Sequence, residues 1–179
     1  MGDIKPPELV KLITGVLVAP PAGLNDVHTA LSREFGAVDA ASNPTPWTES
    51  TYYTAEMGAQ LWRQYLSFAT LIDPGSLPQL KRRTNGLEDR WRGDAGRRVN
   101  IDPGYLSATK LVLASTKDAA HRIFLGDGIY AEATLRYVDG AWQTYPYTYR
   151  DYADAAALAF FTEVRSRFLA QRRAAAAEI

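Results

Sequence analysis

The sequence predicts an α+β fold: a ferredoxin-like βαββαβ unit extended by a C-terminal antiparallel β-meander and a closing helix. The first half of the chain shows strand-like and helix-like patterns in the order strand, helix, strand, strand, helix, strand, which is the order of a ferredoxin-like unit. Two glycine-containing turns then divide a strand-rich stretch. An apolar stripe at helical spacing follows near the C-terminus.

Length and composition fit a single domain over residues 1–179. The chain is long enough to enclose a hydrophobic core, and 46% apolar with 22% charged residues is ordinary for a globular protein. We see no internal repeat and no linker. We therefore assign residues 8–106 to the ferredoxin-like unit and residues 107–173 to the meander with its closing helix.

The first segments supply one strand and one helix of the unit. Residues 8–20 (ELVKLITGVLVAP) are apolar on both alternating sides apart from Lys11, which is typical of a strand buried on both faces. Residues 24–36 have apolar residues at helical spacing and end in Gly36, a plausible helix cap. Residues 37–50 are rich in proline, serine and asparagine, so we expect a loop there.

The next segments complete the unit. Residues 51–58 (TYYTAEMG) and 61–73 (LWRQYLSFATLID) are rich in β-branched and aromatic residues and predict two strands, although the second is also compatible with a helix at its start. A helix is expected from Ser76, with proline in its first turn. Residues 97–106 (RRVNIDPGYL) predict a strand ended by the Asp-Pro-Gly turn that begins at Asp102.

The second half predicts the meander and the last helix. Residues 107–116 are compatible with either a strand or a helix. HRIFL and IYAEATLRYV predict two strands joined by Gly-Asp-Gly, and Asp139-Gly140 is a two-residue hairpin signal leading into AWQTY. The closing helix carries an apolar stripe, which we expect to be buried: Ala157, Phe160, Phe161, Val164 and Phe168.

Composition also narrows the classes of function. Twenty basic residues balance twenty acidic ones, so no general attraction to nucleic acid or to an anionic membrane is indicated. The absence of cysteine excludes disulfides, thiol catalysis and thiolate metal sites. With two histidines besides, we predict no structural zinc site, although a carboxylate-rich magnesium site stays open. The start of the chain is a poor secretory signal and no apolar run is long enough to span a bilayer, so we expect a soluble cytoplasmic protein with no membrane partner.

The hairpin at residues 121–135 carries the main candidate residues. If Gly-Asp-Gly forms a three-residue loop, strand alternation places His121 on the apolar face and Arg122 on the more polar face. Arg122 would then form an exposed cross-strand ion pair with Glu132, worth roughly 0.2–1 kcal/mol. His121 stands beside Asp118. It is either a core-edge histidine or a group that Asp118 orients for proton transfer or for a phosphate contact.

Lysines, arginines and tyrosines elsewhere allow two interpretations each. Lys110 and Lys117 lie at the two ends of the segment KLVLAST. They are either solvated ends of a strand or donors to an anion. The basic stretch at 81–98 is a solvated helix face, with an RNA backbone contact as the alternative. Three tyrosines share one side if their segment is extended, and they either pack or form a stacking platform: Tyr145, Tyr147 and Tyr149.

The common motifs of nucleotide binding and hydrolysis are absent. The chain has no Walker-type phosphate loop, no dinucleotide fingerprint and no nucleophile elbow. Four phrases instead resemble a bacterial family, domain of unknown function 4416: VNIDPGYL (99–106), KLVLASTKD (110–118), HRI (121–123) and GIYAE (128–132). The likeness covers nearly the whole chain. It implies no established activity and assigns no catalytic role to any residue, although some relatives bear a GTP-binding label.

Three hypotheses of function follow. The first, which we favour, is a binding module for an anionic ligand, a nucleotide or an RNA phosphate. Its candidate ligand-binding residues are Lys110, Lys117, His121, Arg122, Tyr130 and Tyr149. The second is a small enzyme that uses His121 with Asp118 or Glu132 as general acid and base. The third is a scaffold or assembly subunit, which includes a homo-oligomer. The sequence indicates no particular cofactor.

Overall fold

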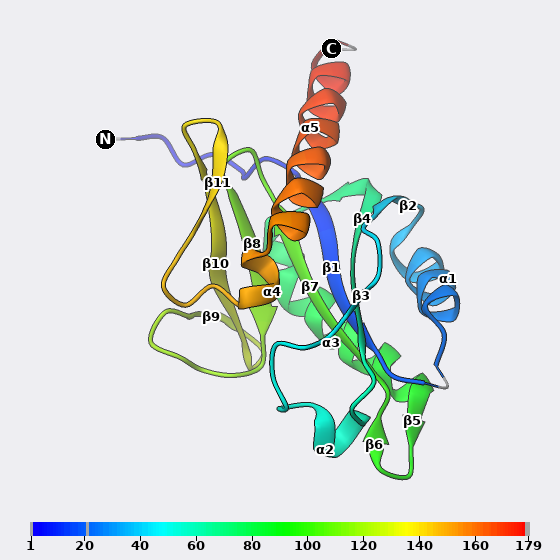
Figure 1. Ribbon diagram of the computed structural model, residues 1–179. Coiled ribbons are helices and arrows are strands. Elements are labelled where there is room, and N and C mark those ends of the chain that lie inside the picture. The colour runs from blue at the N-terminus through cyan, green and yellow to red at the C-terminus, as the bar shows by residue number, and fades with distance from the viewer. Residues whose placement is uncertain (1, 21, 178–179) are drawn as a thin grey trace.

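The computed structural model describes residues 2–20 and 22–177 (Figure 1). Their strands are β1 (Val10–Val18), β2 (Val38–Ala41), β3 (Thr45–Pro46), β4 (Trp62–Ile72), β5 (Arg92–Gly93), β6 (Gly96–Arg97), β7 (Val99–Leu106), β8 (Lys110–Ser115), β9 (Ile123–Gly126), β10 (Ile129–Val138) and β11 (Ala141–Thr144). Their α-helices are α1 (Leu24–Phe35), α2 (Thr54–Met57), α3 (Leu77–Glu88), α4 (Arg150–Ala153) and α5 (Ala155–Ala177), with 3-10 turns at Pro74–Ser76 and Asp89–Trp91.

Nine of these strands form one antiparallel sheet. Its path is β11-β10-β8-β7-β1-β4-β2, with β3 paired to β4 and β9 paired to β10. Within the path, β7-β1-β4-β2 joins the strands of the first half. Mixed helix and strand content with an antiparallel sheet confirms the α+β class, whereas the ferredoxin-like relationship itself stays a prediction.

Helices cover both faces of the sheet. On one face, apolar side chains of α1 and α3 pack against β1, β4 and β7, with Leu31 and Leu80 in the same cluster as Val16. On the other face lies α5, which crosses in front of the sheet in Figure 1. Its predicted apolar stripe is buried at all five positions, against side chains such as Tyr65 and Trp142. The helix continues to Ala177, past the predicted end at residue 173. No helix of residues 2–20 and 22–177 is long and apolar enough to cross a membrane.

Two segments of the first half differ from the prediction. Residues 37–50, expected as a loop, contain β2 and β3, which pair with the same edge of β4. An edge strand such as β3 tolerates proline, because a residue without a backbone N–H can be placed where no neighbouring strand needs that donor. Residues 51–58, expected as a strand, form a turn followed by α2, because Met57 is buried in a small cluster with Leu17 and Leu61. The second strand of the first half is therefore β2.

The Asp-Pro-Gly sequence that begins at Asp102 is not a turn. It lies inside β7, which continues to Leu106 and pairs with both β1 and β8. At Gly104, an added Cβ would lie 2.3 Å from the carbonyl oxygen of Val112, so glycine allows β8 to approach closely. The segment 107–116, compatible with two structures, contributes the strand β8.

The two predicted hairpins are present. Asp139 and Gly140 both have positive φ and join β10 to β11 as a two-residue turn. In the other hairpin, Phe124 pairs with Tyr130, as the predicted register requires. Its loop is one residue shorter than predicted, however, because Gly126 pairs with the first residue of β10 and a bulge follows.

Candidate functional site

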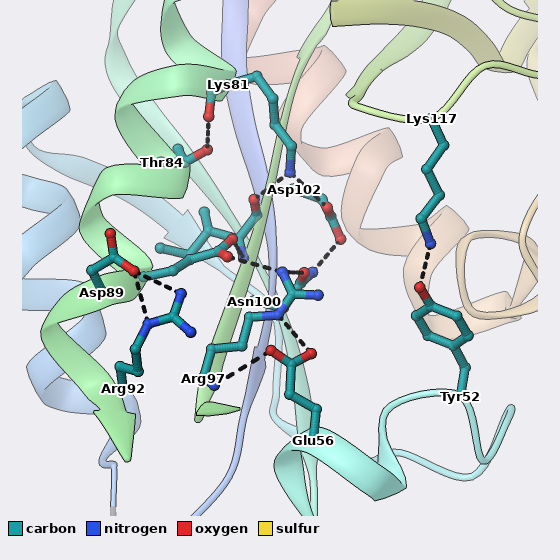
Figure 2. A network of polar contacts seen from close by, with 12 residues as sticks. Tyr52, Glu56, Lys81, Thr84, Asp89, Arg92, Arg97, Asn100, Asp102 and Lys117 are labelled. Carbon is teal, nitrogen blue, oxygen red and sulfur yellow. Dashed lines mark hydrogen bonds and ion pairs between the residues drawn. The ribbon is translucent and has the colours of Figure 1, made fainter. Parts of the chain in front are cut away.

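A cavity of about 900 Å³ opens at one end of the sheet. Its walls come from several separate parts of the chain: the segment that contains α2, the start of β4, α3 with the turn after it, the first half of β7, the end of β8 with the residues that follow it, β10 and the residues around α4. Figure 2 shows part of its polar lining, with α3 and β7 on one side and the α2 segment below.

A hydrogen-bonded network of polar side chains lines the side of the cavity formed by β7. The Lys81 ammonium donates to Asp102 Oδ1 (3.1 Å) and to the carbonyl of Ile101 (3.0 Å). The Asn100 amide donates to Asp102 Oδ2 (2.7 Å). Burial alone would raise the pKa of Asp102, but Lys81, the nearby guanidinium of Arg63 and these hydrogen bonds outweigh it and lower that pKa. Asp102 is therefore a carboxylate fixed in place.

Arg97 continues this network toward α2. Its Nη1 donates to Glu88 Oε2 (3.0 Å) and to Asn100 Oδ1 (2.9 Å), and its Nε donates to Glu56 Oε2 (3.0 Å) (Figure 2). The other oxygen of Glu88 accepts from the backbone N–H of Ile101 (2.7 Å). Burial raises the pKa of Glu88 against the opposing effects of these cationic and N–H partners. The network holds α2, α3 and β7 together through paired charges.

Arg122, His121 and Glu132 form a second cluster. Arg122 Nε donates to Glu132 Oε2 (2.8 Å), and His121 Nε2 lies 3.2 Å from the same oxygen. The Glu132 side chain is 1% exposed and that of Arg122 is 6% exposed. The remaining Arg122 nitrogens donate to Ser115 Oγ, the Lys117 carbonyl and Tyr149 OH (2.7 Å).

This cluster corrects two predictions. The ion pair of Arg122 and Glu132 is buried, not exposed. His121 and Arg122 also do not point to opposite faces, because both contact one carboxylate oxygen. The reason is local: both residues precede β9, in a turn where the Arg122 N–H donates to the Ala119 carbonyl (2.9 Å), so strand alternation does not apply to them. The apolar face predicted for β9 is wrong as well, since Ile123 is 72% exposed.

Lys117 lies on the opposite side of the cavity from Arg97 (Figure 2). Its Nζ donates to Tyr52 OH (2.5 Å) and is 4.2 Å from the centre of that ring. Among the residues described here, Lys117 has no carboxylate partner. Lys110, at the other end of β8, is exposed and lies outside the cavity lining. The first and last residues of β8, Lys110 and Ser115, are roughly 16 Å apart along the strand, and Lys117 follows two residues later.

Some of the other candidate residues line the large cavity and some lie outside it. Glu132 and Tyr149 line the cavity together with Lys117 and Arg122. His121 stacks on Tyr147, with ring centres 4.1 Å apart, and takes Glu132 as its carboxylate partner instead of Asp118. The candidates outside the lining are Lys110, Asp118, His121 and Tyr130.

Arg63 on β4 is a residue that sequence reasoning missed. It lines the large cavity and also a neighbouring one of about 490 Å³. Its Nη2 is 2.7 Å from Asp151 Oδ2, and its guanidinium lies 5.1 Å from the ring centre of Trp47. A signal was present in the sequence: an arginine inside an apolar strand has to be either exposed or matched by a partner.

The family model described as Domain of unknown function (DUF4416) matches residues 8–168. The chain belongs to this family. No curated protein and no solved structure matches the chain. The description of DUF4416 assigns no activity.

The phrases that resemble DUF4416 meet at the large cavity. VNIDPGYL contributes Asn100 and Asp102, KLVLASTKD contributes Ser115 and Lys117, and GIYAE contributes Glu132. These segments are adjacent because β7, β8 and β10 are neighbours in the sheet. The cavity of this DUF4416 chain is thus lined by residues from several of these phrases.

The basic stretch at 81–98 is largely neutralised in this DUF4416 chain. Lys81 is buried, contrary to the expected solvated face, and Arg97 pairs with two carboxylates. Three exposed arginines also have acidic partners: Asp127 for Arg82, Glu34 for Arg83 and Asp89 for Arg92. An open row of unpaired cations, as a backbone contact to RNA would need, does not form there.

Proposed function

We propose that the large cavity binds a small anionic ligand of the nucleotide type. The observation that supports this most is the convergence of Lys117, Arg122 and Tyr149, three of the ligand-binding residues predicted from the sequence, on one cavity of about 900 Å³. Small-molecule sites in proteins commonly have volumes of about 300–1,000 Å³. A nucleotide needs both cationic donors and ring surfaces, and this lining offers both.

The cavity does not attract anions through its net charge. Its lining has seven basic and seven acidic side chains, and most of them neutralise each other in ion pairs. Affinity for an anion therefore depends on donors that the protein itself leaves available. Lys117 is such a donor, because the only hydrogen-bond partner of its ammonium among the described residues is the neutral Tyr52 hydroxyl.

Tyrosines supply the ring surfaces. Tyr52 is 61% exposed and Tyr149 is 49% exposed, and both line the cavity with Tyr53. Stacking of a base on such a ring is worth about 1–3 kcal/mol. The Lys117 ammonium and the Tyr52 ring lie side by side, so an anionic group and a planar ring of one ligand can be bound together.

Titration of the protein with nucleoside monophosphates and with short RNA, at low and high salt, tests the proposal. We expect saturable binding that weakens with salt. Lys117→Ala removes a charge-assisted contact and is expected to weaken binding by about tenfold or more. Lys110→Ala is the matched control, because Lys110 is an exposed lysine at the far end of β8 and lies outside the cavity lining. Absence of saturable binding to the unchanged protein would remove the proposal, and an equal loss in both variants would show that Lys117 is not specific.

An acid–base enzyme is the second candidate, favoured by the 3.2 Å contact between His121 and Glu132. A histidine held by a buried carboxylate is suited to proton transfer. Incubation of the protein with candidate nucleotides, followed by mass spectrometry of the products, tests it. Conversion that His121→Asn abolishes would support the enzyme, and unchanged nucleotides would argue against it.

An assembly role has one supporting feature, the exposed apolar side chains Ile123, Phe124 and Leu125 of β9. Neighbouring exposed apolar residues on an edge strand favour association with another chain. Measurement of molar mass in solution across a range of concentrations tests this role. A constant monomeric mass would remove the case for self-association.

A further inference from the structure

We propose that Arg63 anchors the anionic group of the ligand, and that this group is a terminal one, a phosphate monoester or a carboxylate. The inference rests on the proposed binding function and names the class of ligand that the cavity takes. Arg63 was not among the residues singled out in the sequence, and it lies on β4, on the wall that the two cavities share.

Arg63 is a buried cation, and two of its nitrogen atoms have no hydrogen-bond partner among the described residues. The residue is 5% exposed, and its Nη2 pairs with Asp151 at 2.7 Å. Its Nε and Nη1 are buried and have no hydrogen-bond partner among the described residues. Because buried polar atoms are nearly always hydrogen-bonded in folded proteins, N–H groups left over on a cavity wall indicate a ligand-binding role.

A second unpartnered group lies close to these donors. The hydroxyl of Tyr152 is buried and also lacks a partner among the described residues. Both groups approach Gly15 of β1: a Cβ added there would lie 2.4 Å from Tyr152 OH and 3.1 Å from Arg63 Nη1. Tyr152 and Arg63 both line the large cavity. An O–H and a guanidinium N–H near one point match an anion with two or more oxygens.

The surroundings of Arg63 hold its guanidinium in place before any ligand binds. The guanidinium carbon, Cζ, lies 5.1 Å from the ring centre of Trp47, 5.6 Å from that of Tyr65 and 5.7 Å from that of Tyr152. A planar guanidinium fixed between rings presents its donors in one geometry, which an ammonium does not. The other buried cations of the lining already donate to acidic partners: Lys81 to Asp102, Arg97 to Glu88 and Arg122 to Glu132.

The depth of Arg63 selects the kind of anion. An internal phosphodiester of RNA has chain leaving it in two directions, so it cannot approach a guanidinium enclosed by three rings. A terminal phosphate or carboxylate has only one substituent and can enter end-on. Of the three rings around Arg63, those of Tyr65 and Tyr152 are buried, whereas Trp47 is partly exposed and lines both cavities, so we expect a ligand to reach Arg63 by displacing the Trp47 side chain. The exposed Lys117 then contacts the ligand nearer the cavity mouth.

The test compares three probes on the full-length protein: a nucleoside 5′-monophosphate, the corresponding nucleoside, and a short RNA without terminal phosphates. Affinity is measured by calorimetry for the unchanged protein, for Arg63→Lys, which keeps the charge opposite Asp151, and for Arg167→Lys, an exposed control on α5. We expect the monophosphate to bind best, Arg63→Lys to weaken that binding by about tenfold or more, and Arg167→Lys to leave it unchanged. NMR of the Arg63 Nε–H resonance in the unchanged protein provides a readout that does not depend on how the variant folds, and we expect this resonance to shift in proportion to occupancy.

The possible outcomes separate the two proposals. If the monophosphate binds but the Arg63 resonance does not move, the anchor is elsewhere and the proposed function survives. Equal affinity for the short RNA would overturn the terminal-anion assignment. If none of the probes binds to the unchanged protein, the proposed function fails and the assignment of Arg63 fails with it.

Discussion

Replacement of Gly15 by alanine tests the packing around Arg63 and Tyr152. The added Cβ would lie 2.4 Å from Tyr152 OH, whereas ordinary van der Waals contacts begin at 3.4 Å, so the ring has to move by about 1 Å. Tyr152 is 1% exposed and stacks on Phe161, so the surroundings offer little room. Overpacking of this kind costs about 1–3 kcal/mol, and removal of glycine from a strand returns about 0.5–1 kcal/mol. The difference between these two effects predicts that Gly15→Ala lowers the free energy of unfolding by about 1 kcal/mol.

Gly86→Ala is the matched control for this change. Gly86 lies inside α3, and nothing is within 4 Å of a Cβ added there. Alanine in a helix interior is favoured over glycine by about 1 kcal/mol, so this variant is expected to be more stable. Urea unfolding followed by circular dichroism measures both variants against the unchanged protein. If Gly15→Ala were as stable as the unchanged protein, the close contact of Tyr152 and Arg63 with β1 would be refuted.

Three further predictions concern other parts of the polar network. Glu132→Ala leaves the buried Arg122 without its carboxylate and is expected to lower the free energy of unfolding by about 3–5 kcal/mol in urea titrations; a loss below about 1 kcal/mol would contradict a structural role for this pair. The pKa of Asp102 is lowered in the folded protein, so its contribution to stability is present above the ordinary value of 3.8 and is lost as the pH falls through and below it. Thermal unfolding from neutral to acidic pH is therefore expected to show a smaller acid dependence in Asp102→Asn, and parallel profiles would exclude this contribution. Gln171→Ala removes the hydrogen bond that Gln171 Oε1 accepts from Lys11 Nζ (2.6 Å) and the one that Gln171 Nε2 donates to the Ala69 carbonyl (2.8 Å). We expect the free energy of unfolding to fall by about 1–2 kcal/mol and amide exchange after Phe168 to become faster; unchanged exchange would show that Gln171 does not hold this part of α5 in place.

Local patterns predicted the regular elements well where one physical signal dominates. The stripe of α5 is buried at every predicted position, because apolar spacing of a long helix fixes which side faces the sheet. The turn at Asp139 and Gly140 forms as predicted, because both positions require positive φ. The strand β1 is buried on both faces, including Lys11, whose ammonium is paired with Asp39.

The failures occur where tertiary contacts override local preference. Asp102 starts a sequence that favours a turn, but pairing with β1 and β8 extends the strand through it. Residues 51–58 have strand-like composition, yet the burial of Met57 in a small cluster fixes a helical turn. The side of the sheet predicted for His121 is wrong because β9 begins only at Ile123, so the alternation of side chains along a strand does not apply to His121.

The candidate site was predicted in part. Lys117, Arg122, Glu132 and Tyr149 belong to one cavity, and the sequence pointed to all four. Arg63 and the network around Asp102 were not foreseen, because the cavity is built from segments far apart in the chain whose proximity depends on the order of strands in the sheet. A single sequence contains no direct signal for such long-range contacts.

The most direct test of the binding proposal is a crystal structure of the protein grown with a nucleoside 5′-monophosphate. We predict the ligand in the large cavity, with its phosphate within hydrogen-bond distance of Arg63 or Lys117 and its base against a cavity tyrosine. A monophosphate bound elsewhere on the molecule, with Arg63 and Lys117 in their present contacts, would contradict the account.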